Sequence, residues 1–306
     1  MATPAFLLRP AIVHLHASTL VFGGVLACQP GLKAPSAIVI RDDAGDSVRL
    51  AAPARRIVSL NPTTTELLFS IGAGSRVVGR TRWCESPPEA RSVPSVGEGF
   101  PPNVESVVAR QPDLVVLYHN SGNAMAAERL RELGIPVVRI RTDRLSDVAR
   151  AARMLGALTG SFFSADSVGH AFTAALDQAS IASAGRSTSP ALLLLAWDQP
   201  IVALGSGSFV SEMVERAGAR NVFGDVVAPS APVSMEAIAA REPDAIMTVG
   251  TMAIGFVARP EWRTLAAVRQ QQLFSLSEAA FTHPSLQAPQ AIMRLRTRLS
   301  ALQSKP

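Results

Sequence analysis

The sequence is poor in cysteine, tyrosine and charged residues. It has two cysteines and one tyrosine among 306 residues, and charged residues make up 17% of the chain. Only Cys84 lies beyond the first 28 residues, so that part of the chain cannot form an intrachain disulfide. Its stability must come from buried apolar side chains instead. At 48% hydrophobic residues, a chain of this length is sufficient for two α/β lobes.

Sequence motifs of common nucleotide-binding and hydrolytic sites are also missing. No Gly-x-Gly-x-x-Gly, P-loop or Gly-x-Ser-x-Gly segment occurs. The stretch GSGSF (205–209) is only superficially similar to a phosphate-binding loop. Since no catalytic set of residues is apparent, we expect a protein that is not an enzyme and has no catalytic cofactor. The alternative is an exported enzyme on a doubly wound α/β fold.

Positive charge is in excess but not concentrated. The chain has 29 Lys and Arg residues against 24 Asp and Glu residues, with a sequence pI near 10.2. Nucleic-acid-binding proteins gather such charge in a run or patch. Here the arginines are scattered, with almost no aromatic residues between them. The sequence therefore predicts no nucleic-acid partner.

The first 28 residues differ from the rest of the chain. Arg9 and no acidic residue precede the apolar run AIVHLHASTLVFGGVLA (11–27), which ends directly before Cys28. A basic start, an apolar middle and small residues before a cleavage point describe a secretory signal. The run is shorter than the ~20 residues of a membrane-spanning helix. The cysteine resembles that of bacterial lipoprotein signals, so we expect lipidation at Cys28; an ordinary signal or a short anchor is the alternative.

From residue 37 onward, short strand patterns alternate with helical patterns. The segment Ala37–Leu50 predicts a hairpin, and apolar runs predict strands at 55–60, 77–81, 113–118 and 136–141. Residues 145–184 show no strand pattern, and 164–184 predict a helix about 30 Å long. Strand patterns resume at residue 191. This order predicts two Rossmann-like α/β lobes joined by a single long backbone helix, with a ligand cleft between the lobes.

The expected divisions of the chain follow from these patterns. They are a signal segment (1–28), a tether and hairpin (29–54), an N-terminal α/β lobe (55–144), a helical segment (145–186) and a C-terminal α/β lobe (187–306).

One stretch of sequence occurs twice. NVESVVARQPDLVV (103–116) aligns without gaps on SMEAIAAREPDAIM (234–247). The offset is constant, because 236 − 105 and 244 − 113 both equal 131. The match places Glu105 over Glu236 at the start of a predicted helix. The sequence therefore predicts two similar halves, each with a glutamate at the same place.

With these segments in place, the chain resembles the substrate-binding proteins of bacterial importers for vitamin B12 and iron chelates, the helical-backbone class. The resemblance covers residues 53–303 and rests on RIVSLNPTTTELLFSIGAG, on the repeated stretch and on the long helix. RWCESPPEA (82–90) looks most like the cobalamin-binding branch, with Ser86 where that branch usually has an aromatic residue. The resemblance implies a monomer outside the cytoplasm that delivers a corrinoid to an ABC permease dimer with its ATPase.

The resemblance also implies a role for the repeated glutamates. In the family, one Glu on the outer surface of each lobe docks into arginine pockets of the permease. The matching positions are Glu105 and Glu236. Two carboxylates related by pseudo-two-fold symmetry suit a symmetric partner. The alternative is that both residues simply favour the first turn of a helix.

Aromatic residues stand at the ends of three predicted strands. Trp83 follows one strand, Tyr118 ends the next, and Trp197 ends the first strand of the second half. Ligands of α/β proteins bind at the carboxyl ends of strands. Aromatic rings there suit a large planar macrocycle such as a corrin or haem. Burial in the core is the alternative for each ring.

Four other residues are weaker candidates for contact with the ligand. Phe100 and Phe281 lie in predicted loops, and Asn61 and Thr63 stand at a helix start, where backbone N–H groups can bind polar ligand atoms. N-capping explains the latter pair equally well.

No firm metal site is predicted. His119 or His283 is a possible axial ligand for cobalt or haem iron, but the two histidines are far apart in the sequence. Haem or a ferric siderophore is therefore the alternative to cobalamin as the transported ligand, with Arg80 and Arg82 as candidate siderophore contacts.

Overall fold

The computed structural model describes residues 37–181, 189–250, 252 and 254–303. The predicted signal segment with Cys28 lies outside the described residues. Among the residues that are described, no helix combines the length and the apolar character needed to cross a membrane.

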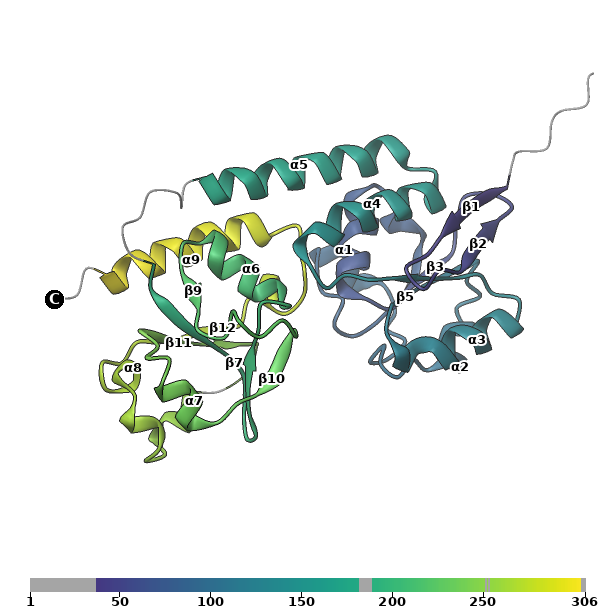
Figure 1. The fold of residues 1–306 in the computed structure, drawn as a ribbon. Coiled ribbons are helices and arrows are strands. Elements are labelled where there is room, and N and C mark those ends of the chain that lie inside the picture. Colours follow the sequence, from purple (N-terminus) through teal and green to yellow (C-terminus); the bar gives the residue numbers. More distant parts are fainter. Residues whose placement is uncertain (1–36, 182–188, 251, 253, 304–306) are drawn as a thin grey trace, which may run out of the picture. The chain divides into compact units, whose positions relative to one another are not determined.

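The N-terminal lobe is built on a parallel sheet in the order β4-β3-β5-β6 (Figure 1). Its strands are β3 (Ile57–Ser59), β4 (Val77–Arg80), β5 (Leu114–Tyr118) and β6 (Val137–Ile140). An antiparallel hairpin precedes it, made by β1 (Ile38–Arg41) and β2 (Ser47–Leu50). The short Val- and Leu-rich runs form strands because both faces of a parallel sheet are covered by helices.

Helices connect these strands. They are α1 (Pro62–Ser70), α2 (Val104–Val108), α3 (Ala124–Glu132) and α4 (Leu145–Thr159), with 3-10 turns at 74–76, 88–92 and 121–123. Asn61 caps α1, because its Oδ1 accepts a hydrogen bond from the backbone N–H of Thr63 at 2.8 Å. Since α1 follows β3 directly, its first turn lies at the carboxyl edge of the sheet.

The C-terminal lobe has a mixed sheet in the order β10-β8-β7-β11-β12, with β9 beside the start of β7. The strands are β7 (Ala191–Asp198), β8 (Ile201–Leu204), β9 (Arg220–Asn221), β10 (Ser230–Pro232), β11 (Ala245–Val249) and β12 (Leu273–Leu276). The helices are α6 (Phe209–Arg216), α7 (Met235–Ala239), α8 (Ala266–Arg269) and α9 (Ala288–Gln303), with 3-10 turns at 254–258, 262–264 and 279–281.

The two lobes share one strand order. The path β9-β7-β11-β12 in the second lobe corresponds to β4-β3-β5-β6 in the first, and its pairs are likewise parallel. The offset of 131 residues carries α2 onto α7 (104 + 131 = 235) and β5 onto β11 (114 + 131 = 245) without a shift. The duplication that the sequence predicts therefore extends to the backbone.

The repeat also includes the turn between helix and strand. Gln111 (φ 50°) and Glu242 (φ 45°) both take the left-handed conformation just before the proline of their copy. Asp113 then accepts a hydrogen bond from the backbone N–H of Arg56 at 2.9 Å, and Asp244 accepts one from Ala191 at 2.7 Å. In each lobe the aspartate that precedes one strand thus forms a hydrogen bond with the backbone at the start of the neighbouring strand.

The long helix α5 (Phe162–Ile181) joins the two lobes and packs against α4 and α9 (Figure 1). Its 20 residues span about 30 Å. Glycine is needed at position 156 of α4, because an added Cβ would lie 2.4 Å from the Cβ of Ala165. One apolar cluster contains Leu155 of α4, Leu176 of α5 and Leu299 of α9, so a continuous core runs under both lobes.

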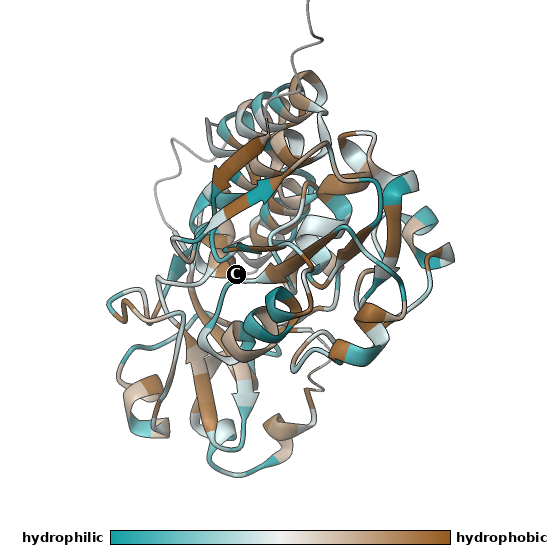
Figure 2. Cartoon of the chain, turned by 90° about the vertical axis from the view of Figure 1, so that its right-hand side faces the viewer, coloured by the Kyte–Doolittle hydropathy of each residue, from teal (hydrophilic) through white to brown (hydrophobic). Residues whose placement is uncertain are grey.

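Hydrophobic residues are concentrated in the strands of both sheets (Figure 2). The outer sheet faces have cores of their own, which include Val107 in the first lobe and Ile238 in the second. The predicted fold class, two α/β lobes joined by one long helix, is confirmed.

Candidate ligand-binding site

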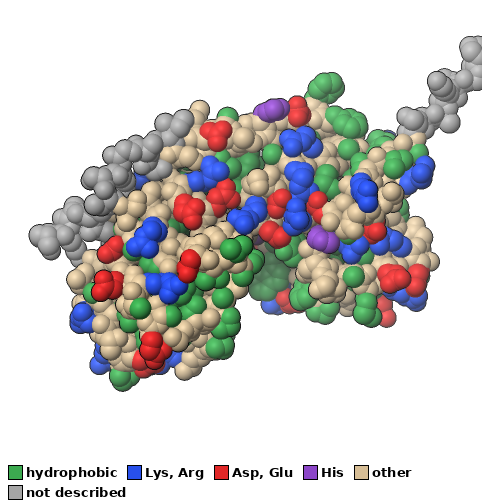
Figure 3. All heavy atoms as spheres, in the orientation of Figure 1, with side chains coloured by type: hydrophobic (Ala, Val, Ile, Leu, Met, Phe, Trp, Pro, Cys, Tyr) green, Lys and Arg blue, Asp and Glu red, His purple; other side chains and the backbone are tan. Residues whose placement is uncertain are grey.

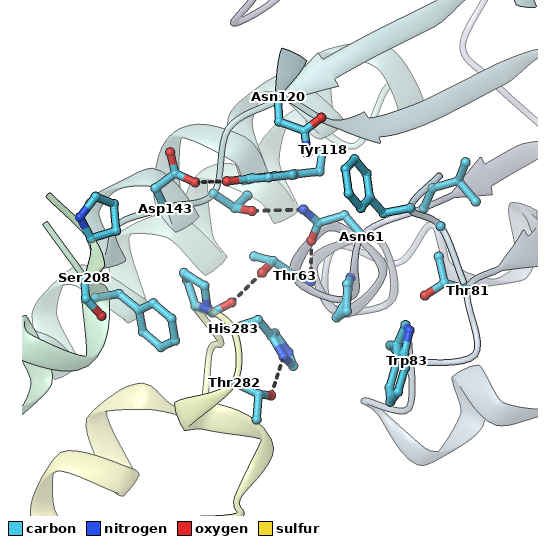
Figure 4. A pocket seen from close by; sticks show the side chains of 18 of the residues that line it. Asn61, Thr63, Thr81, Trp83, Tyr118, Asn120, Asp143, Ser208, Thr282 and His283 are labelled. Carbon is cyan, nitrogen blue, oxygen red and sulfur yellow. Dashed lines mark hydrogen bonds between the residues drawn. The ribbon is translucent and has the colours of Figure 1, made fainter. Parts of the chain in front are cut away.

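A cavity of about 860 Å³ lies between the two lobes. The first lobe contributes the segments that follow β3, β4, β5 and β6, and the second contributes the start of α6 and the loop 282–284. Figure 3 shows the hollow between the lobes, and Figure 4 shows the side chains around it. The volume is near the upper end of the ~300–1,000 Å³ typical of ligand sites. The cavity thus suits a large ligand.

One wall of the cavity presents exposed aromatic surface. Trp83 and Phe100 line it and are 56% and 60% exposed. Trp83 is held in place by two neighbours: its Nε1 donates to Glu98 at 3.0 Å, and the guanidinium carbon of Arg82 lies 4.4 Å from its ring centroid. A ring fixed in this way loses little conformational freedom when a ligand covers it.

Tyr118 and Asp143 form a hydrogen-bonded pair on another wall (Figure 4). The hydroxyl of Tyr118, at the end of β5, donates to Oδ1 of Asp143, which follows β6. Burial, together with the neighbouring Asp143 carboxylate, raises the pKa of Tyr118 well above its usual value. The phenol therefore stays protonated at neutral pH.

Asn61 and Thr63 also line the cavity, but their polar groups are largely engaged within the protein. The Nδ2 of Asn61 donates to Thr142 at 3.0 Å, and its Oδ1 caps α1. The hydroxyl of Thr63 donates to the carbonyl of Pro284 at 2.7 Å. Since Pro284 belongs to the second lobe, this bond fastens the two lobes together at the cavity wall.

Glu66 makes a second connection between the lobes. Its carboxylate, in a residue only 5% exposed, accepts hydrogen bonds from Ser285 Oγ at 3.1 Å and from the backbone N–H of Leu286 at 3.2 Å. Burial raises the pKa of Glu66, and the hydrogen bonds act in the opposite direction. On another part of the boundary Arg144 donates to the carbonyl of Ser206 at 2.9 Å.

The structure does not favour either histidine as an axial ligand. His283 lines the cavity, but its Nδ1 is 3.1 Å from Thr282 Oγ1 and its Nε2 is covered by protein atoms. Burial lowers the pKa of His283 to about 4, so its ring is neutral at pH 7. His119 is not part of the lining. Among the described residues, no group of three or more His, Cys, Asp or Glu side chains is placed to hold a metal ion.

Two of the residues predicted to contact the ligand, Phe281 and Trp197, are not part of the cavity lining. Phe281 is 1% exposed and packs in the core, because the 3-10 turn 279–281 directs it toward α9 and away from the cavity. Trp197 is 57% exposed but stands outside the lining. The strand β7 pairs with β11 only up to Leu195 and then continues into a hairpin with β8, which carries Trp197 past the sheet edge.

Several lining residues are not among those predicted from the sequence; they include Asp143, Asn120, Glu98 and Phe209. Asp143 and Asn120 follow the ends of β6 and β5, so the rule that finds Trp83 and Tyr118 also finds them. Phe209 follows the glycines of GSGSF. That stretch has a packing role, because a Cβ at Gly207 would lie 2.4 Å from the carbonyl oxygen of Val227.

Glu105 and Glu236 are far from this cavity and lie in equivalent places. Each is exposed in the first turn of its helix, α2 or α7, and is absent from the lining. In Figure 1 both helices lie on the side of their lobe away from α5. Hydrogen bonds from Ser234 and the backbone lower the pKa of Glu236.

A model of the periplasmic binding protein family matches residues 57–280, a range that runs through both lobes and the helix between them. The chain therefore belongs to the periplasmic binding protein family. Membership gives it a solute-binding role, and its two-lobed fold with one linking helix is that of the helical-backbone class.

Known proteins resemble the chain along most of its length. A vitamin B12-binding protein of Vibrio cholerae is 25% identical over 254 residues, which cover 83% of this chain and 92% of that protein. An uncharacterised ABC transporter substrate-binding lipoprotein of Bacillus subtilis is 28% identical, with 78% of each chain covered.

Solved structures agree on the fold. The periplasmic vitamin B12-binding protein BtuF of Vibrio cholerae superposes with a TM-score of 0.68 at 25% identity, over 83% of this chain and 99% of that chain. A periplasmic haem-binding protein of Roseiflexus has a TM-score of 0.74 at 22% identity, over 81% and 99%. The latter identity supports the fold alone.

Proposed function

We propose that the protein captures a corrinoid such as cobalamin outside the cytoplasm and delivers it to the permease dimer of an ABC importer and its ATPase. It binds and releases this ligand without chemical change. The observation that carries the proposal is a large cavity with exposed aromatic surface, in which neither the described lining tyrosine nor the described lining histidine is free to coordinate a metal. Trp83 and Phe100 offer faces on which a planar ring can stack.

The cavity suits a corrinoid better than haem because of axial ligation. A corrinoid brings the axial ligands of its cobalt with it, whereas haem iron in proteins is held by a side chain such as His or Tyr. Tyr118 is a protonated phenol bonded to Asp143, and the Nε2 of His283 is covered. Neither residue is ready to serve as that ligand.

The arginines considered for a ferric siderophore are also engaged. Arg80 donates to the carbonyl of Ala90 at 2.8 Å, and Arg82 pairs with Glu98 at 2.8 Å. Recognition of an anionic chelate needs cations that face it. The vitamin B12-binding relatives, which match most of this chain, support the same choice.

Delivery requires contact with the permease, and we assign it to Glu105 and Glu236. Both carboxylates are exposed, both stand in the first turn of a capped helix, and the two helices correspond in the duplicated lobes. A lipid on Cys28 would keep the protein, acting as a monomer, close to the membrane that holds its permease.

A titration of the purified protein with cyanocobalamin, haemin and a ferric hydroxamate, each followed by calorimetry and visible spectra, tests this proposal. We expect one corrinoid per protein and no change in cobalt ligation. Saturable binding of haemin with a shifted Soret band, and no corrinoid binding, would overturn the assignment in favour of haem.

A further inference from the structure

The described charged residues that line the cavity are acidic. Among the described lining residues, Glu98 and Asp143 are the carboxylates, and no Lys or Arg is present. Glu98 is compensated, because Arg82 lies 2.8 Å from it and Trp83 donates to it. Asp143 forms no ion pair within the described part of the chain. The cavity wall therefore carries, at this residue, a carboxyl group without an ion-pair partner among the described residues.

Asp143 is held in one place by its neighbours. Its backbone N–H donates to Oδ2 of Asp147 at 3.0 Å, and its Oδ1 accepts the hydroxyl of Tyr118. The charge of Asp147 is itself balanced by Arg150 at 3.0 Å, and Arg144 is directed to the carbonyl of Ser206. The Oδ2 atom of Asp143 accepts no hydrogen bond from a described residue. A fixed carboxylate with a vacant acceptor thus borders the cavity.

We propose that Asp143, oriented by Tyr118, determines specificity by accepting a hydrogen bond from an amide N–H of the ligand and by rejecting ligands with carboxylates at that place. The inference rests on the proposed function and deepens it. Cobalamin and cobinamide carry amide side chains around the ring, whereas haem and the unamidated corrinoids carry carboxylates. The pair would thus select among macrocycles of similar shape by the chemistry of their edges.

The size of the preference depends on which ligand group faces Oδ2 of Asp143, an amide N–H or a carboxylate. An amide N–H donating to a carboxylate makes a charge-assisted hydrogen bond, which is about twice as strong as a neutral one. A ligand carboxylate at the same place leaves that acceptor without a donor and adds repulsion between like charges. We expect a preference for the amide of about tenfold or more.

Two corrinoids with the same ring provide the test. Dicyanocobinamide carries amides, and dicyano-cobyrinic acid carries carboxylates in their place. Their dissociation constants are measured by calorimetry at neutral pH for the wild type, Asp143→Asn and Glu128→Gln. Asparagine keeps the shape and the acceptor for Tyr118 and adds an N–H that suits a carboxylate. Glu128→Gln removes one charge at an exposed position outside the lining and serves as the matched control.

The expected result is a preference for dicyanocobinamide that falls by about tenfold in Asp143→Asn and by less than about twofold in Glu128→Gln. An unchanged preference in Asp143→Asn overturns the inference, as does an equal loss in both variants, which would indicate net charge alone. Tyr118→Phe retains the carboxylate but loses its orientation, so a weaker affinity for dicyanocobinamide is expected, with equal thermal stability confirming the fold. If the wild type binds neither corrinoid, the proposed function itself fails, whereas equal binding of both contradicts only the role of Asp143.

Discussion

The two lobes are alike on the surfaces that carry α2 and α7, and they differ where they line the cavity. Helices α2 and α7 match residue for residue, each with a capped start, an exposed glutamate and one buried anchor, Val107 or Ile238. Toward the cavity the symmetry is lost. The first lobe supplies Trp83 and the lining carboxylates, whereas the second supplies mostly small side chains and backbone, with Phe209 and His283 as exceptions.

This difference indicates what each surface recognises. A duplicated outer surface fits a partner with two equivalent sites, as a permease dimer has. An asymmetric cavity fits a ligand that has no two-fold symmetry, and a corrinoid with different groups above and below its ring is such a ligand. This comparison predicts that substitutions on the two outer surfaces have equal effects on permease binding. Substitutions around the cavity should have unequal effects on ligand binding in the two lobes.

The largest effect is expected from the paired glutamates. Glu105→Ala and Glu236→Ala should each weaken binding to the permease–ATPase complex by about tenfold, and the double variant by about 100-fold, because distant sites act additively. The measurement is surface plasmon resonance with the complex in nanodiscs. Glu128→Ala, at an exposed glutamate of α3 outside the repeat, is the control.

Affinity for cyanocobalamin should remain unchanged in all of these variants, because neither glutamate lines the cavity. A large loss in one single variant and none in the other would show that the lobes dock differently, and the symmetry argument would then fail.

The next largest effect is on ligand affinity, and it should differ between the two exposed tryptophans. Trp83→Ala should raise the dissociation constant for cyanocobalamin by about tenfold or more, because the ring offers stacking surface inside the cavity. Trp197→Ala should change it by less than about twofold, because Trp197 stands outside the lining. Calorimetry measures both constants. Equal losses would mean that the ligand reaches beyond the cavity to the β7–β8 hairpin.

Trp197 shows why the fold was easier to predict than the site. The apolar runs and the constant offset placed α2, α7, β5 and β11 correctly, because buried strands and capped helices are encoded locally. The rule that ligands meet strand ends selects Trp83 and Tyr118, which line the cavity, and their contact with a ligand stays a prediction. The rule also selects Trp197, which lies outside the lining, because the sequence pattern does not show that the end of β7 pairs with β8 instead of a parallel neighbour.

Tertiary packing decided the remaining differences. Nothing local distinguishes Phe100, which lines the cavity, from Phe281, which is buried against the core. Glu66 lies in α1, yet its partners Ser285 and Leu286 are more than 200 positions away in the sequence. Contacts of that range depend on how the lobes meet.

A smaller effect, on stability, concerns the connection that Glu66 makes between the lobes. The pKa of Glu66 is raised in the folded protein, so the folded state binds the proton more tightly than the unfolded state does. The resulting stability is present below the unfolded pKa and is lost as pH rises through the folded pKa. Wild-type stability should therefore fall relative to Glu66→Gln as the pH rises above the unfolded pKa of a glutamate.

Thermal melts of both proteins at a series of pH values above this pKa measure the difference. Ser285→Ala should shift the fall to higher pH, because the hydroxyl of Ser285 favours the ionised form of Glu66. A pH-independent gap between wild type and Glu66→Gln would show that the carboxylate does not change its protonation between the folded and unfolded states.

The smallest expected effect compares the two helix caps. Asn103 accepts a hydrogen bond from the N–H of Ser106 at 2.9 Å, and Ser234 accepts one from Ala237 at 3.2 Å. Asn103→Ala and Ser234→Ala should each cost about 0.5–1 kcal/mol in urea unfolding and add in the double variant. Permease binding should nevertheless differ between them. Ser234 also lowers the pKa of Glu236, so its loss weakens the preference for the charged form. Equal changes in docking near pH 5 would show that the caps act only by ordering their helices.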